Sequence, residues 1–216
     1  MLRNFDLLQF LVRLPVLLIS FTIHEFAHGL SAYLLGDSTA KLDGRLSLNP
    51  IRHIDPIGAL MILFIGIGWA KPVMVSTDRL KNPKGDLAII SFCGPLSNFI
   101  LAFIFILLYV PASFYLLPQD NAIHRFIIMF IEQGFMLNIA LGVFNMLPIP
   151  PLDGLKVFAS ILPDRLYNQV MYFNARVGMV LFLVLAATGL LSRIITPIDY
   201  AVMNAYFKLA GKIFSF

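Results

Sequence analysis

The chain has 216 residues, of which 59% are apolar and 13% are charged, and its mean hydropathy is +0.84. Because about a quarter of the residues of a soluble domain are charged, this composition excludes an ordinary soluble protein and indicates a membrane-embedded helical bundle. The net charge of +4 is too small to indicate nucleic-acid binding, and the single cysteine, Cys93, excludes an internal disulfide. The chain contains only two glutamates, Glu25 and Glu132. Because glutamate is so scarce, each one inside an apolar stretch needs an explanation.

The first apolar segment covers residues 7–35, which is long enough to cross a bilayer as a tilted helix. Its ionisable side chains are Arg13 and a cluster at residues 24–28. A cleaved secretory signal is the alternative, because Arg3 precedes the apolar run. The segment has no obvious small-residue cleavage site, and ionisable groups at membrane depth are typical of functional helices. We therefore predict a first transmembrane helix here.

Residues 36–85 are rich in glycine and proline and predict an irregular connection. The apolar run 57–70 within it contains three glycines, and it is shorter than the roughly 17 residues that a spanning helix needs. We predict a re-entrant or interfacial hairpin there. Residues 69–75 then show an alternating pattern of side chains and include β-branched residues, which favours a strand. Pro72 disfavours a central position for this strand in a sheet. This pattern predicts an edge strand at the membrane surface.

Three further apolar segments follow along the chain. Residues 87–117 contain no charged side chain and predict the second spanning helix. The third begins near residue 122 and continues to residue 147, where a proline-rich stretch ends it, and the fourth covers about 177–191. Residues 194–216 fit either an interfacial amphipathic helix or a short fifth span.

The expected fold is therefore an all-α polytopic membrane protein with about four to five transmembrane segments and a small re-entrant or β-hairpin element between the first two. We expect one domain over residues 1–216, with additional carboxyl-terminal helices at 177–216.

Lysine and arginine residues are concentrated in one loop. The connection between the second and third predicted spans carries only Arg125, whereas seven such residues lie between the first two. The positive-inside rule then places the first loop in the cytoplasm. On this topology His28 and Asp153 lie near cytoplasmic helix ends, at comparable depth in the membrane. The seven lysine and arginine residues between the first two predicted spans are Lys41, Arg45, Arg52, Lys71, Arg79, Lys81 and Lys84.

Residues 24–28 read His-Glu-Phe-Ala-His. On a helix, His24 and His28 lie on one face, one turn apart, which suits two imidazoles to share a metal ion. Glu25 is rotated by about 100° from His24 and can reach a water bound to such a metal rather than the metal itself. This pattern is typical of a metal-activated hydrolase. The alternative is a polar helix face that pairs with neighbouring helices.

A catalytic zinc ion usually has three protein ligands and an open fourth position, so one ligand must come from elsewhere in the chain. The strongest candidate is Asp153, which follows a stretch with three prolines and precedes Gly154. Irregular backbone is tolerated in a membrane where it is buried in protein or lines a wet cavity, so this carboxylate could point inward at the metal. Its alternative role is to cap a helix that begins at Leu155.

Three other ionisable residues are weaker candidates. His53 lies in a loop beside Arg52 and Asp55, where a solvated or structural role is expected, and His124 is predicted on the opposite side of the membrane. Glu132 is a lone carboxylate in an apolar segment, where such groups are functional by default, but it could also be neutral or paired with a neighbouring amide. We leave these three residues outside the predicted site.

Three motifs of the sequence resemble those of the site-2 protease family of intramembrane zinc metalloproteases. Residues 24–28 match the zinc-binding helix of that family, residues 145–154 match its Asn-x-x-Pro-x-Pro-x-x-Asp-Gly signature, and residues 94–98 are similar to its Gly-Pro-x-x-Asn element. The resemblance covers about residues 19–154, roughly two thirds of the chain. Similarity to the compact prokaryotic subgroup without PDZ or CBS domains extends to residues 48–50, 53–58 and 68–73.

This resemblance implies a zinc endopeptidase that hydrolyses peptide bonds in or near the transmembrane segments of membrane-tethered substrates, in regulated intramembrane proteolysis. It implies that His24, His28 and Asp153 hold one Zn2+ and that Glu25 is the general base. For the oxyanion we expect a donor from Asn98, with Asn145 behind it. Either amide could instead form a hydrogen bond between helices. The implied location is a prokaryotic cell membrane, with the active site towards the cytoplasmic side.

A helical substrate must unwind before its backbone can be attacked, because the helix hides its peptide groups in internal hydrogen bonds. The predicted edge strand could pair with the unwound segment by strand addition, which gives Lys71 and Val73 a substrate-binding role. The expected partners are therefore a membrane-protein substrate with a transmembrane segment and the lipid bilayer, and no nucleic acid.

Two other classes of function are compatible with parts of this pattern. One is a catalytically silent membrane scaffold, which the intact His-Glu-x-x-His and Asp set argues against. The other is a metal-ion transporter, which the uncharged second span argues against. Zinc-dependent cleavage of a peptide separates these classes.

Overall fold

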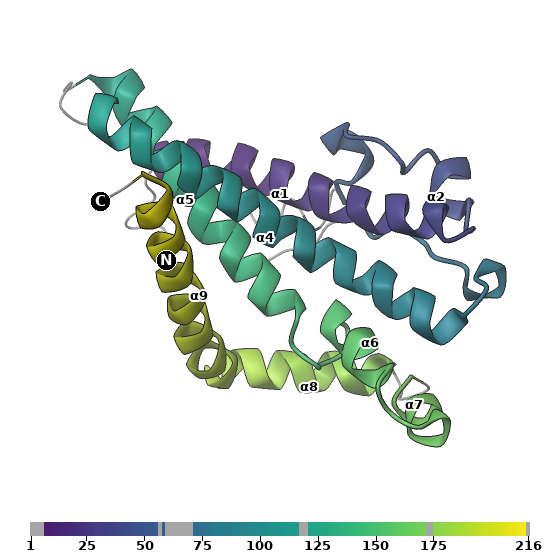
Figure 1. Cartoon of the computed structure of the whole chain (residues 1–216). Coiled ribbons are helices and arrows are strands. Elements are labelled where there is room, and N and C mark those ends of the chain that lie inside the picture. The colour runs from purple at the N-terminus through teal and green to yellow at the C-terminus, as the bar shows by residue number, and fades with distance from the viewer. Residues whose placement is uncertain (1–6, 56–57, 59–70, 117–120, 172–174, 215–216) are drawn as a thin grey trace.

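The centre of the molecule is a group of three long helices, α1 (Leu7–Leu34), α4 (Pro83–Leu116) and α5 (Ala122–Asn145). Helix α4 packs against both α1 and α5, which also contact each other (Figure 1). Each of the three is long and apolar enough to cross a membrane, as the sequence predicts. The computed structural model describes residues 7–55, 58, 71–116, 121–171 and 175–214.

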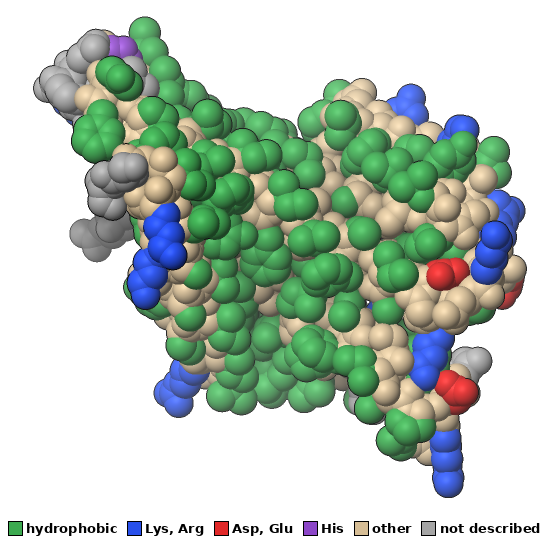
Figure 2. Space-filling view, viewed as in Figure 1, with side chains coloured by type: hydrophobic (Ala, Val, Ile, Leu, Met, Phe, Trp, Pro, Cys, Tyr) green, Lys and Arg blue, Asp and Glu red, His purple; other side chains and the backbone are tan. Residues whose placement is uncertain are grey.

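The faces of α4 show how the bundle meets its surroundings. Ile100, Ile104 and Leu108 follow one another at helical spacing and are about half exposed, which places them towards lipid. In Figure 2 hydrophobic side chains cover the body of the bundle, and most lysine and arginine side chains lie at its ends. This surface fits a protein that is embedded in a bilayer.

Small residues bring α4 and α5 close together. A Cβ atom at Gly134 would lie 2.5 Å from the Phe105 ring, and one at Gly142 would lie 2.7 Å from the Phe99 ring. Small residues at helix interfaces let neighbouring backbones approach closely in membranes. The apolar core of this interface contains Ala102, Phe105, Ile106, Val110, Ile131, Phe135, Ile139 and Val143.

The connection between α1 and α4 contains the short helices α2 (Thr39–Leu42), η2 (Pro50–Arg52) and η3 (Thr77–Arg79). No strand is assigned within the described residues 71–76, although exposed and partly buried side chains alternate at 72–75. The Lys71 N–H donates to the His53 carbonyl at 2.8 Å. The predicted hairpin at 57–70 lies outside the described residues except for residue 58, so the β element stays a prediction.

The carboxyl-terminal third differs from the expectation. It contains α6 (Asp153–Ala159), α7 (Asp164–Met171), α8 (Ala175–Ala187) and α9 (Leu190–Phe214). The predicted fourth span of 177–191 is not one straight helix, because α8 ends at Ala187 and the chain bends by 74° into α9. Gly189, with a φ of +72°, lies at this bend.

The number of spans follows from this bend. The described residues contain three helices that could cross a membrane, or four if the bent α8–α9 pair is one broken span. The predicted all-α polytopic class is confirmed. The expected interfacial helix or fifth span at 194–216 is the greater part of α9, which packs against α4 and α5.

Candidate metal centre

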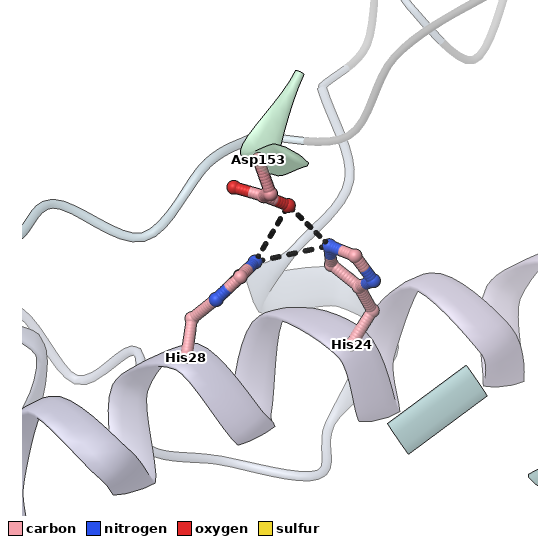
Figure 3. A group of neighbouring side chains, drawn as sticks. All are labelled: His24, His28 and Asp153. Carbon is pink, nitrogen blue, oxygen red and sulfur yellow. Dashed lines mark hydrogen bonds and ion pairs between the residues drawn. The ribbon is translucent and has the colours of Figure 1, made fainter. Parts of the chain in front are cut away.

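Two histidines and one aspartate meet at the junction of α1 and α6 (Figure 3). His24 and His28 project from α1, and Asp153 is the first residue of α6. The Asp153 Oδ2 atom lies 3.2 Å from His24 Nε2 and 3.1 Å from His28 Nε2, and the two Nε2 atoms are 3.0 Å apart. The structure therefore brings together the three residues that the sequence predicts as metal ligands.

The hydrogen-bond partner of Nδ1 in each imidazole indicates whether that nitrogen carries a proton. His24 Nδ1 lies 2.7 Å from Asn98 Oδ1, and His28 Nδ1 lies 2.7 Å from the carbonyl oxygen of Ile90. Both oxygens only accept hydrogen bonds, so each Nδ1 carries the proton and donates it. With a proton on Nδ1, a ring that binds a metal does so through the lone pair of Nε2, the atom that faces the cluster.

This arrangement fits a divalent cation. One carboxylate oxygen and two imidazole nitrogens converge within 3.0–3.2 Å of one another, and such a group of acceptor atoms is stabilised by positive charge, which a divalent cation among them would supply. Ligands at about 2.0–2.1 Å from a tetrahedral zinc would be separated by about 3.3 Å, close to the 3.0–3.2 Å separations among His24, His28 and Asp153. Two imidazoles and one carboxylate are also an established donor set for catalytic zinc.

A glycine of α4 leaves space beside the ligand atoms. A Cβ atom at Gly94 would clash with His28 Nε2 and would lie 2.7 Å from His24 Nε2. No other residue type could occupy this position without filling the space next to both imidazoles. Gly94 therefore allows both imidazoles to lie directly against α4, a role that the sequence analysis did not recognise beyond the motif match.

The backbone before α6 positions Asp153. Residues 146–152 are not helical, and the chain enters α6 directly from this segment. A Cβ atom at Gly154 would clash with the backbone of Met146 and lie 2.5 Å from the Leu147 carbonyl oxygen, so only glycine allows α6 to pack this close to the end of α5. Lys156 lies 3.5 Å from Asp153 Oδ1 and adds positive charge on the far side of the carboxylate.

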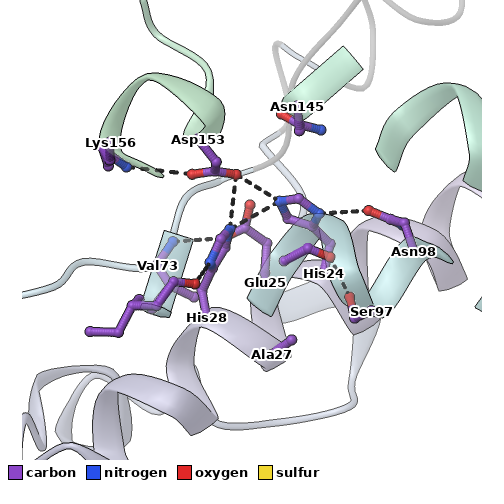
Figure 4. Close-up of polar contacts among 12 residues, drawn as sticks. His24, Glu25, Ala27, His28, Val73, Ser97, Asn98, Asn145, Asp153 and Lys156 are labelled. Carbon is purple, nitrogen blue, oxygen red and sulfur yellow. Dashed lines mark hydrogen bonds and ion pairs between the residues drawn. The ribbon is translucent and has the colours of Figure 1, made fainter. Parts of the chain in front are cut away.

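Glu25 lies beside the cluster and is partly buried. Its Oε2 atom accepts a hydrogen bond of 2.9 Å from the Val73 N–H (Figure 4). Residues 71–76 thus run close to α1 and fix one oxygen of the carboxylate. This places a potential base next to the metal position, as the residue spacing on α1 predicts.

The two asparagines of the predicted site differ in their contacts. Asn98 is fully buried and holds His24 through Oδ1, while its Nδ2 donates to Asn138 at 2.9 Å and to the Ser20 carbonyl at 3.4 Å. An oxyanion donor needs an N–H directed at the reacting carbonyl, so this geometry favours a positioning role for Asn98. Asn145 donates to the Leu141 carbonyl of its own helix at 3.0 Å, and no dashed line joins it to the other residues drawn in Figure 4.

The weaker candidates lie outside the cluster. His53 is buried, and its Nε2 donates to the Ser47 carbonyl at 2.7 Å. His124 lies in the first turn of α5, where its backbone N–H donates to the capping Asn121 side chain. Glu132 is on an exposed face of α5. Among the described residues, His24, His28 and Asp153 form the group that could hold a metal ion.

One buried polar residue near the site escaped the sequence analysis. Asn138 is fully buried on α5 and bonds to Asn98. A buried amide on a spanning helix is expensive, and its spacing of four residues from both Gly134 and Gly142 places it on the face that packs against α4. These two signals could have identified it.

An apolar helical bundle with a His-Glu-x-x-His helix and a facing aspartate defines the class of membrane-embedded metallopeptidases. The model of peptidase family M50 matches residues 112–185, which include Asp153. The chain belongs to this family, the site-2 protease family.

Three curated relatives support the assignment. The Bacillus subtilis protein named "Putative zinc metalloprotease YwhC" is 39% identical over 92% of this chain and 90% of its own length. The Methanocaldococcus jannaschii "Putative zinc metalloprotease MJ0611" is 31% identical over 71% of this chain and 72% of its own length. The Mycolicibacterium smegmatis "Putative zinc metalloprotease Rip2" is 28% identical over 90% of this chain and 75% of its own length. No solved structure matches the chain.

Proposed function

We propose that the chain is an intramembrane zinc endopeptidase that cleaves peptide bonds in or near the transmembrane segments of membrane-tethered substrates. The observation that carries this proposal is the convergence of three metal-ligand atoms, from His24, His28 and Asp153, next to Glu25. A structural metal site usually has four protein ligands and needs no base beside it. Three ligands with an adjacent glutamate are typical of hydrolysis.

In this proposal His24, His28 and Asp153 hold the ion, which when bound supplies the Lewis acidity that polarises the peptide carbonyl and acidifies water. Glu25 accepts the proton of the attacking water and passes it to the amine leaving group. The Val73 N–H donates a hydrogen bond to Oε2 of Glu25, so we propose that Oε1 is the atom that accepts the proton of the water. Holding the carboxylate by a backbone amide keeps the base in a fixed orientation during the proton transfer.

The two asparagines take different roles in the proposal. The amide nitrogen of Asn145 has two protons, and the bond to the Leu141 carbonyl uses only one of them. We therefore assign Asn145 as the donor to the developing oxyanion. Asn98 orients His24 instead, because both of its polar atoms are already bonded.

Residues 71–75 are the proposed docking edge for an unwound substrate. Lys71 is anchored to His53 and Val73 to Glu25, so the N–H of Val73 is not available for pairing with a substrate. We place the substrate along the opposite edge, which includes Met74, whose side chain is 62% exposed. A Met74→Pro variant should slow cleavage of a membrane substrate while zinc binding is retained, and unchanged cleavage would exclude this edge.

The remaining features of the proposal concern the setting of the enzyme. We place it in a prokaryotic cell membrane as a single domain, with the metal centre towards the cytoplasmic side, because the connection between α1 and α4 is rich in lysine and arginine. Release of a membrane-tethered regulator is the proposed outcome of cleavage.

The direct test compares the native protein with Glu25→Gln in detergent. Zinc content is measured together with cleavage of a membrane-segment substrate. We expect about one zinc per chain in both proteins and cleavage only by the native one. The matched control is Glu132→Gln, which changes the other glutamate on the exposed face of α5 and should retain cleavage.

Each alternative class predicts a different result. A silent scaffold would bind zinc without cleaving any of a panel of membrane-segment peptides. A transporter would move zinc across sealed vesicles without cleavage. Cleavage by Glu25→Gln at the native rate would contradict the role of Glu25 as the base.

A further inference from the structure

A chain of buried hydrogen bonds joins the backbone of α5 to one metal ligand. Asn138 Nδ2 donates to the Gly134 carbonyl at 2.8 Å, and Asn98 Nδ2 donates to Asn138 Oδ1 at 2.9 Å. Asn98 Oδ1 lies 2.7 Å from His24 Nδ1. Both asparagines are fully buried, so the chain runs through the interior of the bundle from α5 through α4 to α1.

The direction of every bond in this chain is set at its α5 end. The Gly134 carbonyl can only accept a hydrogen bond, so Asn138 must turn its amide nitrogen towards it and its oxygen towards Asn98. Asn98 must then offer its nitrogen to Asn138, which leaves its oxygen facing His24. An oxygen at that place accepts only from a protonated Nδ1, and this directs the lone pair of Nε2 to the metal position.

We propose that Asn138 is a positioning residue that fixes the orientation and the tautomer of the metal ligand His24 through Asn98. The proposal rests on the metal centre of the proposed function. Asn138 itself touches neither the metal position nor any ligand atom, and it acts by preventing Asn98 from flipping. A flipped Asn98 would present N–H to His24 Nδ1 and would favour the tautomer that places a proton at the metal position.

His28 needs no such chain of amides to fix its orientation. His28 Nδ1 donates to the backbone carbonyl of Ile90, a group that cannot flip. His24 faces a side-chain amide instead, whose oxygen and nitrogen could exchange places. Asn138 removes that ambiguity through a bond of 2.9 Å, which is shorter than the 3.4 Å bond of the same Asn98 nitrogen to the Ser20 carbonyl. The two glycines that flank Asn138 at a spacing of four residues bring α5 close enough to α4 for the bond to form.

The test measures zinc affinity by competition with a chelator for the native protein and two variants of residue 138. Asn138→Leu removes both bonds and should weaken zinc binding by about 10–100-fold, the usual effect of losing the group that orients a ligand. Asn138→Asp should retain most of the native affinity. Burial raises the pKa of a carboxyl, and a neutral carboxyl at this position can donate through O–H to Gly134 while its carbonyl oxygen accepts from Asn98.

A second readout separates positioning from general stability. Nitrogen chemical shifts of His24 in the zinc-free protein should report the Nδ1–H tautomer in the native and Asn138→Asp proteins and a mixture in Asn138→Leu. The matched control is Thr22→Val, which removes a buried hydroxyl of α1 that donates to the Leu18 carbonyl of the same helix. It should leave both the zinc affinity and the His24 tautomer unchanged.

Three outcomes would overturn the inference: native zinc affinity in Asn138→Leu, equal loss of affinity in Asn138→Leu and Asn138→Asp, or loss of affinity in Thr22→Val of the same size. A native protein that bound no zinc would instead contradict the proposed function itself. The thermal midpoint of each zinc-free variant shows whether a loss of affinity follows a loss of folding.

Discussion

The two halves of the metal centre are supported in different ways. His24 and His28 lie on one continuous helix, α1, and a group of α4 holds each ring at Nδ1. Asp153 begins a helix of 7 residues that follows a non-helical segment. That segment packs against the end of α5 and against α8, where the Phe144 and Phe182 rings have centroids 5.8 Å apart.

This difference indicates how the site is assembled. The histidine half is built within the α1–α4 interface of the bundle, where groups of α4 hold both rings. The aspartate half depends on the packing of a short segment and of α6, which contacts α4, so a bound metal would add a direct link between α1 and α6. Substitutions in the two halves should therefore differ in how strongly they affect zinc binding.

The largest effect is expected from Gly94→Ala. The added methyl group would overlap with His28 Nε2 and fill the space beside His24 Nε2. Zinc affinity should fall by more than the roughly 10–100-fold that the loss of a supporting hydrogen bond costs. The measurement is the zinc content per chain after dialysis against a chelator.

Gly29→Ala is the matched control for this substitution. Gly29 is next to His28 on α1, and the nearest atom to its added Cβ would be Ala40 Cβ at 3.4 Å, an ordinary contact. Zinc content should be unchanged in the control. Full zinc content in Gly94→Ala would show that the metal lies elsewhere.

A smaller effect is expected from Gly154→Ala in the aspartate half. Its methyl group would clash with the backbone at Met146 and Leu147 and push α6 away from α5. Overpacking of this kind costs about 1–3 kcal/mol of folding free energy. Zinc affinity should fall by about tenfold, because the carboxylate can recover part of the displacement by rotating. A lower thermal midpoint with native zinc affinity would show that Asp153 does not depend on this packing.

The role of α8 is tested by Gly178→Ala. A Cβ atom at Gly178 would lie 2.6 Å from Pro150 Cβ, so α8 should move away from the segment that precedes Asp153. We expect a loss near the lower end of about 1–3 kcal/mol and a decrease in zinc affinity below tenfold, because α8 can shift as a whole. Chelator competition and thermal unfolding measure both. A tenfold or larger loss of zinc affinity would place α8 in direct support of the carboxylate.

The sequence predicts the three central helices well, because each is a long apolar run that ends at glycine or proline. It predicts the α8–α9 region poorly. The apolar character continues across Thr188 and Gly189, so hydropathy alone merges residues on both sides of the bend into one span. The positive φ of Gly189 is a helix-ending signal of a kind that composition alone does not weigh against continuous hydropathy.

In the site, too, the features that depend on local sequence are predictable, and those that depend on helix packing are not. The helical spacing of His24 and His28 follows from the sequence, and the motif around Asp153 identifies the third side chain. The contacts of Asn98 depend instead on the packing of three helices, which decides that its oxygen faces His24 and its nitrogen faces Asn138. Spacing along one helix carries no information about which end of an amide faces which neighbour.

Asp37 tests a third region, the connection that carries Val73 to Glu25. Its carboxylate is fully buried and accepts hydrogen bonds from the Thr39 side chain and from the backbone N–H groups of Thr39 and Ser76. Burial raises the pKa of Asp37, but these hydrogen bonds outweigh it and hold the pKa below its usual value. The bond to Ser76 fixes the end of the segment that begins at Lys71.

The smallest effect on zinc binding is therefore expected from Asp37→Asn. A carboxyl group whose pKa is lower in the folded state stabilises the fold above its unfolded pKa of about 3.9, and this stabilisation is lost as the pH falls through the folded pKa. At pH 7 the variant should lose about 1–3 kcal/mol, seen as a lower thermal midpoint, while zinc affinity stays native and cleavage slows because Val73 holds Glu25 less firmly. The two midpoints should approach each other as the pH falls below about 3.9 and should converge only below the folded pKa of Asp37. A difference that is constant with pH would mean that Asp37 contributes through its shape and not through its charge.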